Sequence, residues 1–374
     1  MTETSEWIDS NDKLQTVCDQ LLSVTTLAVD TEFIRTDTFY PKIALIQLSD
    51  GQQCWLIDVL AIDQFAPLKS LLESPHLTLI FHACAEDLEV LDYALDIQPR
   101  NIFDTQIAAG LINIGYSMGY ARLVESLFAI QLDKQETRSN WLARPLSQRQ
   151  LDYAQIDVLY LHRLYRELSM GLADQQRQEW FAEEMQGLFS LVENRKNTDD
   201  YYLRIKGAWR LNARSLTVLN RLCCWRENIA RTKDKPRSRV IKDTVLLEIA
   251  KQLPTTKQQL FSIEDWYPSS IKRYGDSVLN ETKAVGEEPL LPVLPQPLSK
   301  DMMVVLKSIR ETLASVAKDQ QIPPEFLCNK RELEDILRSS LQGNCQWPSR
   351  LTEGWRRLWV KPTIESVLTS ANLL

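Results

Sequence analysis

Three short apolar runs near the amino terminus constrain the fold of this 374-residue chain more than any other feature. The runs VTTLAVDTEF, KIALIQLSD and QCWLIDVL occupy residues 24–33, 42–50 and 53–60, and each has the character of a β-strand. Asp50-Gly51, between the second and third runs, is a strong hairpin signal. These residues therefore predict a sheet that begins with antiparallel strands.

Helices and strands alternate after this hairpin. Residues 64–73 and 85–95 have helical patterns, LTLIFHA at 77–83 is predicted to be a buried strand, and a short strand at 102–104 leads into a helix from Thr105. Strands in hairpins followed by alternating helices and strands indicate a mixed sheet in an α/β layer fold. From Gln148 to Leu168 apolar residues recur at helical spacing, which predicts one helix, and Ser147 with Gln150 fits a capping box at its start.

The strand pattern does not continue beyond about residue 200. Residues 205–280 are predicted to be helical, whereas residues 286–298 contain a glycine and four prolines, which indicates an extended linker. Helical patterns return over 299–374. We therefore predict an α/β domain over 1–195, a helical domain over 205–285, a proline-rich linker over 286–298 and a second helical domain over 299–374.

Two acids interrupt the first apolar run. Asp30 and Glu32 are two residues apart in a strand, so both side chains point to one face. Tyr153 and Asp157 are four apart in a helix and also share a face, and Asp87 opens the helix after the buried strand LTLIFHA. If these acids converge, divalent cations with oxygen ligands would remove their repulsion, and two ions about 4 Å apart can hold a phosphodiester and activate a water.

Each of these residues also has an ordinary structural explanation. Asp30 can end a strand, Glu32 can face solvent, Asp87 can favour a helix dipole, and Asp157 can be a surface acid beside a core Tyr153. Spacing alone therefore leaves the metal site and the ordinary explanations both open.

The three acidic segments, read in order, resemble the motifs of the DEDD family of 3′–5′ exonucleases: VDTEF, HACAEDLEVL and YAQID. The tyrosine four residues before the last aspartate marks the DEDDy subgroup. The flanking text DTEFIRTDTFYPKIALIQL, IFDTQIAAGL and LDKQETRSNWLARPLSQRQLDYAQIDVLYL is similar to the bacterial ribonuclease D family. Residues 205–285 resemble an HRDC domain, and residues 299–374 resemble a second, more divergent copy.

This resemblance implies a ribonuclease H-like mixed-sheet α/β catalytic domain followed by two all-α HRDC-type domains. It implies that Asp30, Glu32, Asp87 and Asp157 bind two divalent ions, Mg²⁺ or Mn²⁺, and that Tyr153 orients the attacking water. The reaction would release 5′-mononucleotides from RNA with a free 3′ end, such as tRNA precursors. Two alternatives remain open: a DNA 3′–5′ exonuclease of the repair or proofreading type, and a non-catalytic nucleic-acid-binding protein.

Five further residues near these motifs have more than one interpretation. Lys134 and Arg144 lie where relatives contact or frame substrate, and either could meet a phosphate. Trp141, between them, is interpreted as core packing. Asp104 is often present in relatives, but here it is interpreted as the N-cap of the helix TQIAAGL. His82 is interpreted as a satisfied histidine at a strand end rather than a metal ligand.

The charge of the chain is unevenly distributed. The net charge is −7, yet residues 201–242 contain twelve Lys and Arg against two acids, a local charge of +10 that leaves −17 for the rest. Such a region can bind nucleic acid, although a set of solvated helix faces is the more common explanation of a charge run.

The sequence gives little indication of a targeting signal, a disulfide framework or a metal-binding cysteine motif. The acidic, polar amino terminus does not have the character of a signal peptide, and no apolar run approaches the length of a membrane span. Seven scattered cysteines without a CxxC pair argue against a disulfide framework or a zinc site. We expect a cytoplasmic enzyme with reduced thiols, no membrane association and no obligate protein partner.

Overall fold

The computed structural model describes residues 4–132, 139–194, 200–286 and 289–374. The chain divides into two compact units. The first, here termed the sheet unit, comprises Met1–Ile34, Lys42–Val192 and Leu298–Leu374, and the second, the helical unit, comprises Arg35–Pro41 and Glu193–Pro297.

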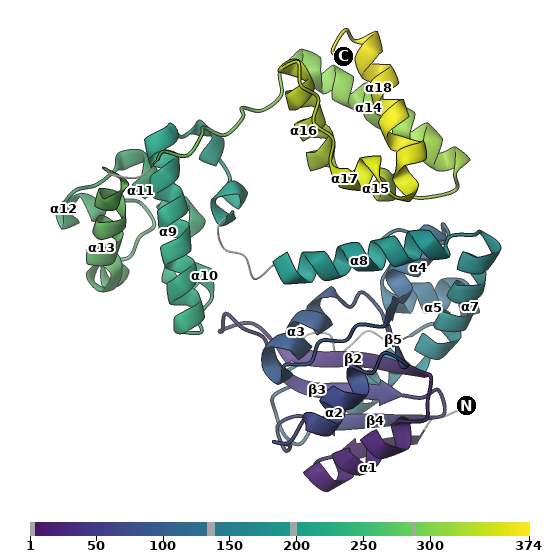
Figure 1. Cartoon of the computed structure of the whole chain (residues 1–374). Helices are drawn as coiled ribbons and strands as arrows, with labels where there is room; N and C mark the ends of the chain where they lie inside the picture. The colour runs from purple at the N-terminus through teal and green to yellow at the C-terminus, as the bar shows by residue number, and fades with distance from the viewer. Residues whose placement is uncertain (1–3, 133–138, 195–199, 287–288) are drawn as a thin grey trace. The chain divides into compact units, whose positions relative to one another are not determined.

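A six-stranded mixed sheet forms the centre of the sheet unit, in the order β1-β4-β3-β2-β5-β6 (Figure 1). β2, β3 and β4 are antiparallel neighbours, whereas β1 is parallel to β4, and β5 and β6 continue in parallel from β2. The predicted hairpin turn at Asp50-Gly51 joins β3 to β4, and Gly51 has a φ of 89°, which a residue with a side chain rarely adopts. The predicted mixed-sheet α/β fold class is confirmed. The strand bounds are β1 (Thr4–Ile8), β2 (Thr26–Ile34), β3 (Lys42–Ser49), β4 (Gln53–Asp58), β5 (Thr78–Phe81) and β6 (Ile102–Asp104).

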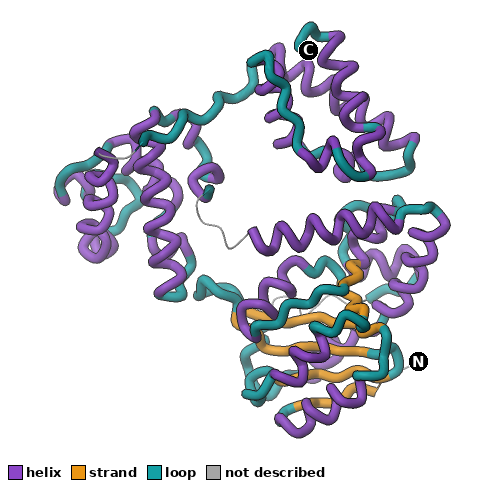
Figure 2. The backbone as a smooth tube through the Cα atoms, viewed as in Figure 1, coloured by secondary structure: helices purple, strands orange, loops and turns teal. Residues whose placement is uncertain are grey.

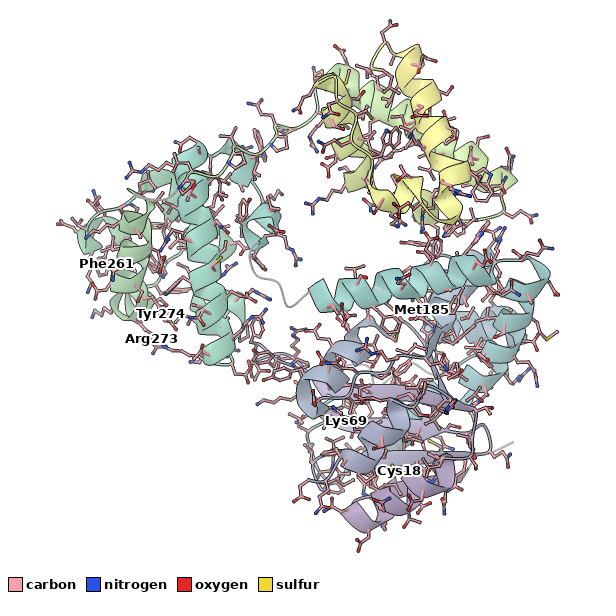
Figure 3. The ribbon with its side chains drawn as sticks, viewed as in Figure 1. Cys18, Lys69, Met185, Phe261, Arg273 and Tyr274 are labelled. Atoms are coloured by element: carbon pink, nitrogen blue, oxygen red, sulfur yellow. The ribbon has the colours of Figure 1, made fainter. Side chains whose placement is uncertain are left out.

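Helices cover both faces of this sheet (Figure 2). Leu27 and Val29 of β2 pack into the cluster on one face, and Ala28 packs into the cluster on the other, as strand alternation requires. Met185 of α8 (Gln178–Asn194) joins the first of these clusters (Figure 3). The first face carries α1 (Asn11–Leu21), α2 (Ala66–Leu72) and α3 (Ala85–Leu95), and the second carries α4 (Thr105–Leu111), α5 (Tyr120–Phe128), α6 (Gln148–Leu159) and α7 (Leu161–Asp174).

The helix predicted to run unbroken from Gln148 to Leu168 is in fact two helices. α6 ends at Leu159 and α7 begins at Leu161. The hydroxyl of Tyr120 donates to the carbonyl of Ile156 at 2.8 Å and accepts from the amide of Tyr160 at 3.1 Å. A side chain inserted between a carbonyl and the amide four residues later interrupts the helix, which periodicity alone does not reveal.

The carboxy-terminal helices pack within the sheet unit. Trp355 stacks on Trp180 of α8 with ring centroids 4.6 Å apart, and Arg356, 1% exposed, forms ion pairs with Glu183 and Glu184 of the same helix. Residues 299–374 therefore share a core with α8, although the sequence pattern predicts a domain of their own. The elements are α14 (Lys300–Asp319), α15 (Pro324–Leu327), α16 (Lys330–Leu341), α17 (Ser349–Thr352), η4 (Trp355–Leu358) and α18 (Val360–Ser370).

The helical unit is built around α9 (Ala213–Thr232) and α13 (Pro268–Lys283). Tyr274 of α13 meets Trp225 of α9 with ring centroids 5.7 Å apart (Figure 3). The loop 35–41 belongs to this unit, because Asp234 accepts hydrogen bonds from the amides of Phe39 and Tyr40, both at 3.0 Å. The remaining elements are η1 (Tyr201–Arg204), η2 (Ala208–Arg210), α10 (Arg237–Val240), α11 (Asp243–Gln252), α12 (Lys257–Leu260) and η3 (Ala284–Gly286).

Candidate active site

The two acids of the first apolar run lie beyond the end of the neighbouring strand. β5 pairs only with Thr26–Ala28 of β2, so Asp30 and Glu32 extend past it, at the edge where open α/β sheets form their sites. α6 packs across β2, β3 and β4 and brings Asp157 to the same place. One carboxylate oxygen from each of Asp30, Glu32 and Asp157 lies within 4.8 Å of the other two.

Asp87 reaches this cluster from the other helical layer. It lies in the first turn of α3 and is buried, and its Oδ1 accepts a hydrogen bond from the hydroxyl of Thr31 at 2.5 Å. Thr31 stands between the two acids of β2 and therefore points to the opposite face of the sheet. The Asp87 carboxylate is still close enough to raise the pKa of Asp30.

Burial raises the pKa of every acid in the cluster, and nearby carboxylates raise it further. Burial is the largest cause in each case. The pKa of Glu32 rises to about 9, with the neighbouring carboxylates Asp157 and Asp87 adding to the effect of burial. The pKa of Asp157 rises to about 7 and that of Asp87 to about 6, and the pKa of Asp30 lies well above its ordinary range. Buried like charges of this kind call for a cation.

Tyr153 is attached to this cluster through Asp157. Its hydroxyl interacts with the Asp157 carboxylate closely enough to offset part of the rise in the pKa of that acid. Burial raises the pKa of Tyr153 itself, so the hydroxyl keeps its proton. The predicted capping box of Ser147 and Gln150 is confirmed and fixes the start of α6, one turn before Tyr153.

Asp104 is the N-cap of α4, as the sequence predicts. Its carboxylate accepts from the amides of Gln106 and Ile107, and also from those of Ala83 and Cys84 in the turn between β5 and α3. Ala83 has a φ of 61°, a conformation that a residue other than glycine adopts only when its surroundings hold it there. Asp104 therefore stabilises the turn that precedes α3, the helix that carries Asp87.

Arg144 is fully occupied by protein partners. Its Nε and Nη2 form a bidentate pair with Asp58 at 2.9 and 2.6 Å, and its remaining donors reach the carbonyls of Ala44, Trp141 and Ala143. These contacts argue against the phosphate contact that the sequence suggested, because a phosphate would have to displace one of them. Trp141 is 2% exposed, in agreement with core packing. Lys134, the other predicted substrate contact, lies outside the described residues.

Sequence reasoning missed three polar residues around the acids. Thr31 and Tyr120 are described above, and the third is Gln47 of β3, directly opposite Asp30 in the β2–β3 ladder. Gln47 is 0% exposed, and neither end of its amide has a hydrogen-bond partner among the described residues. Strand alternation around the acids could have identified Thr31 and Gln47, whereas the position of Tyr120 depends on tertiary packing.

The donor set suits a hard divalent cation. All the candidate ligands are carboxylate oxygens, the donors that Mg²⁺, Mn²⁺ and Ca²⁺ prefer, and no soft sulfur or imidazole ligand joins the acidic cluster within the described residues. His82 instead pairs its Nδ1 with the hydroxyl of Thr105 at 2.9 Å. The orphaned amide of Gln47 adds a polar group beside the cluster, on the same face of the sheet as Asp30. The residues therefore fit a divalent metal centre.

Known proteins match this chain over nearly its whole length. A family model described as a 3′-5′ exonuclease matches residues 5–173, and an HRDC domain model matches residues 215–282. Ribonuclease D of Pseudomonas paraeruginosa is 36% identical over 373 residues, 98% of each chain, and that of Escherichia coli is 32% identical and covers 94% of this chain and 95% of its own.

The crystal structure of Escherichia coli RNase D, described as an exoribonuclease involved in structured RNA processing, superposes with a TM-score of 0.89 at 30% identity and covers 99% of both chains. The exonuclease fold implies the use of divalent metal, in agreement with the acidic cluster. The chain therefore belongs to the ribonuclease D family of 3′–5′ exoribonucleases.

Proposed function

We propose that this enzyme trims RNA from the 3′ end by two-metal-ion hydrolysis and releases 5′-mononucleotides, with Mg²⁺ as the ion. The observation that carries the proposal is the convergence of Asp30, Glu32 and Asp157, with Asp87 beside them, at the end of β2. One buried acid and three half-buried acids whose pKa values are raised are a costly arrangement in a fold, and bound cations offset that cost.

Each residue of the site has a proposed role. The carboxylates of Asp30, Glu32, Asp87 and Asp157 hold the ions, which, when bound, lower the pKa of a water and stabilise charge on the phosphodiester. Tyr153 keeps its phenolic proton in the hydrogen bond to Asp157. Its oxygen remains free to accept a hydrogen bond from the attacking water, which fixes the direction of attack.

RNA with a free 3′ end is the proposed substrate, and tRNA precursors are the natural class that we propose. The superposed relative is described as acting in structured RNA processing, which supports an RNA rather than a DNA substrate for this chain. We place the reaction in the cytoplasm, a reducing compartment that suits the seven free cysteines. No helix within the described ranges has the length and apolar character needed to cross a membrane.

The helical unit is proposed to bind nucleotides of the RNA other than those at the cleaved phosphodiester. Its excess of basic residues is smaller than the sequence count suggests, because several arginines form ion pairs: Arg221 with Glu281, Arg226 with Asp243, Arg231 and Arg237 with Glu227, and Arg239 with Asp37. A cavity of about 410 Å³ in this unit is lined by Lys235, the exposed ring of Tyr267, and Lys242, which is paired with Asp265 at 3.9 Å. Lysines beside an exposed aromatic ring suit a phosphate and a stacked base.

One experiment tests the proposed reaction. A 5′-labelled single-stranded RNA with a free 3′ end is incubated with the full chain and Mg²⁺, with EDTA, or with Asp157→Asn in place of the wild type. We expect stepwise shortening that stops with EDTA and with the variant. Endonucleolytic products, or cleavage that persists in EDTA, would contradict the proposal. A matching DNA strand that is shortened faster than the RNA would favour the repair-type exonuclease.

A further inference from the structure

The break between α6 and α7 lies in the turn that carries Asp157. In a continuous helix the amide of Tyr160 would donate to the carbonyl of Ile156, and Asp157 would lie inside that closed turn. The hydroxyl of Tyr120 instead stands between the two groups, donating to the Ile156 carbonyl at 2.8 Å and accepting from the Tyr160 amide at 3.1 Å. The turn around Asp157 is therefore closed through a side chain from α5.

The inserted hydroxyl satisfies both backbone groups while it holds them apart. A phenol has one donor and can accept as well, so neither the carbonyl nor the amide is left unpaired. The direct hydrogen bond would bring Ile156 and Tyr160 to the ordinary helical spacing. The separation imposed by Tyr120 therefore sets how the last turn of α6 opens and which way Asp157 is directed.

The ring and the charge environment of Tyr120 keep this insertion in place. Its ring meets His82 edge-on, with centroids 5.7 Å apart. Burial raises the pKa of Tyr120, and the carboxylates of Asp157 and Asp30 raise it further, so the phenol stays protonated and remains a donor. Those two acids are members of the metal cluster, which places the hydroxyl within electrostatic reach of it.

We infer that Tyr120 is a positioning residue of the active site: its hydroxyl, inserted between Ile156 and Tyr160, fixes the Asp157 carboxylate in the direction that metal binding requires. The inference rests on the proposed role of Asp157 as a metal ligand. Residues that orient a metal ligand typically contribute about tenfold to a hundredfold in metal affinity or activity.

Tyr120→Phe tests this inference, because it keeps the ring against His82 and removes only the hydroxyl. The helix can then close the direct hydrogen bond between Ile156 and Tyr160 and redirect Asp157. We expect the dissociation constant for Mn²⁺ alone, measured by calorimetry, to rise about tenfold. The turnover rate at limiting metal falls to match, whereas KM for RNA at saturating metal stays at the wild-type value.

Tyr165→Phe is the matched control. Tyr165 of α7 is also partly buried, its ring packs on Phe103, and no hydrogen bond of its hydroxyl occurs among the described residues. Each variant's melting temperature with Mn²⁺ is referred to its own metal-free value, so that a general loss of stability does not imitate weaker metal binding. Tyr120→Phe with the same Mn²⁺ affinity as Tyr165→Phe would overturn the inference.

Asp157→Asn separates this inference from the proposed function. If Asp157→Asn binds Mn²⁺ as tightly as the wild type, the ligand role of Asp157 fails, and the inference fails with it. If Asp157→Asn loses Mn²⁺ binding while Tyr120→Phe retains it in full, the proposed function stands and only the positioning role of Tyr120 is overturned.

Discussion

The phenol of Tyr153 lies beside the carboxylate of Asp157, one helical turn further along α6, and lowers the pKa of that acid. The pair combines a proton donor with a buried acid whose pKa is raised to about 7. The helix fixes the distance between the two side chains, so neither has to be ordered again when substrate arrives.

Tyr153→Phe should slow the reaction without weakening RNA binding. The ring keeps its packing, but the oxygen that orients the attacking water is lost, and general positioning effects of this kind are worth about a hundredfold or more in rate. Single-turnover cleavage at saturating Mg²⁺ measures the rate, and filter binding with catalysis blocked by Ca²⁺ measures affinity. An unchanged rate would show that Tyr153 does not orient the water.

The stability of the metal-free protein should fall as the pH rises. Glu32, Asp157 and Asp87 have pKa values near 9, 7 and 6 in the fold, above the ordinary carboxyl value of about 4 in the unfolded chain. The folded state therefore binds more protons than the unfolded state across this range. The stabilisation is fully present below about pH 4 and is lost as the pH rises through the folded pKa values.

Melting temperatures in EDTA between pH 5 and pH 9 check this prediction. We expect the melting temperature to decline as the pH rises. Asp30→Asn should make this decline shallower, because the variant removes one of the repelling charges. Replacing EDTA with Mg²⁺ should also reduce the decline. Asp152→Asn changes an exposed acid of α6, the helix that carries Asp157. This variant is the control and should follow the wild-type curve. A metal-free protein that becomes more stable from pH 5 to pH 9 would contradict the raised pKa values.

Arg144→Ala should destabilise the fold rather than weaken substrate binding. The change leaves the Asp58 carboxylate buried without its bidentate partner, which costs about 3 kcal/mol in the free energy of unfolding. Urea denaturation measures this loss, and Arg149→Ala, at an exposed position of α6, serves as the control. If Arg144→Ala is as stable as the control and instead raises KM for RNA, the side chain is a phosphate contact after all.

Arg356 should be needed to hold the carboxy-terminal helices on α8. Arg356→Ala leaves Glu183 and Glu184 without their buried partner, at a cost of about 3 kcal/mol, while the carbonyl of Phe326 keeps Arg350 as a donor. Arg357→Ala, at the exposed neighbouring position, should be neutral. Urea denaturation and limited proteolysis near residue 298 measure the stability of Arg356→Ala and Arg357→Ala. Equal resistance of the two variants would show that Arg356 is not needed to hold the carboxy-terminal helices on α8.

The unpaired lysines of the helical unit should account for part of the salt dependence of RNA binding. Lys206 and Lys235 are exposed and have no ion pair among the described residues, whereas Arg237 is paired with Glu227. Removing both lysines should lower the slope of log affinity against log salt by about 1.4 for a single strand. An unchanged slope in Lys206→Ala/Lys235→Ala, with Lys251→Ala as the control, would indicate that this surface is merely solvated.

Local patterns in the sequence were sufficient for strands β2 to β6 and for the order of the acidic segments along the chain, but they did not predict β1 or the break between α6 and α7. Period-two spacing predicts that Asp30 and Glu32 share a face, the capping residues predict the start of α6, and Asp104 is predicted as an N-cap. Each of these depends on neighbours within a few residues, so chain geometry alone determines it. The three motifs, read together with their flanking residues, also indicate the family.

Tertiary packing decided what local spacing cannot express. Arg144 is paired with Asp58 and is therefore not free for a phosphate. Acids from distant segments form ion pairs with several arginines of residues 201–242. Residues 299–374 pack into the core around α8. Tertiary packing also inserted Tyr120 into a helix that periodicity predicts to be continuous. These outcomes depend on which distant side chains meet once the chain is compact, and a pattern of neighbouring residues carries no information about such contacts.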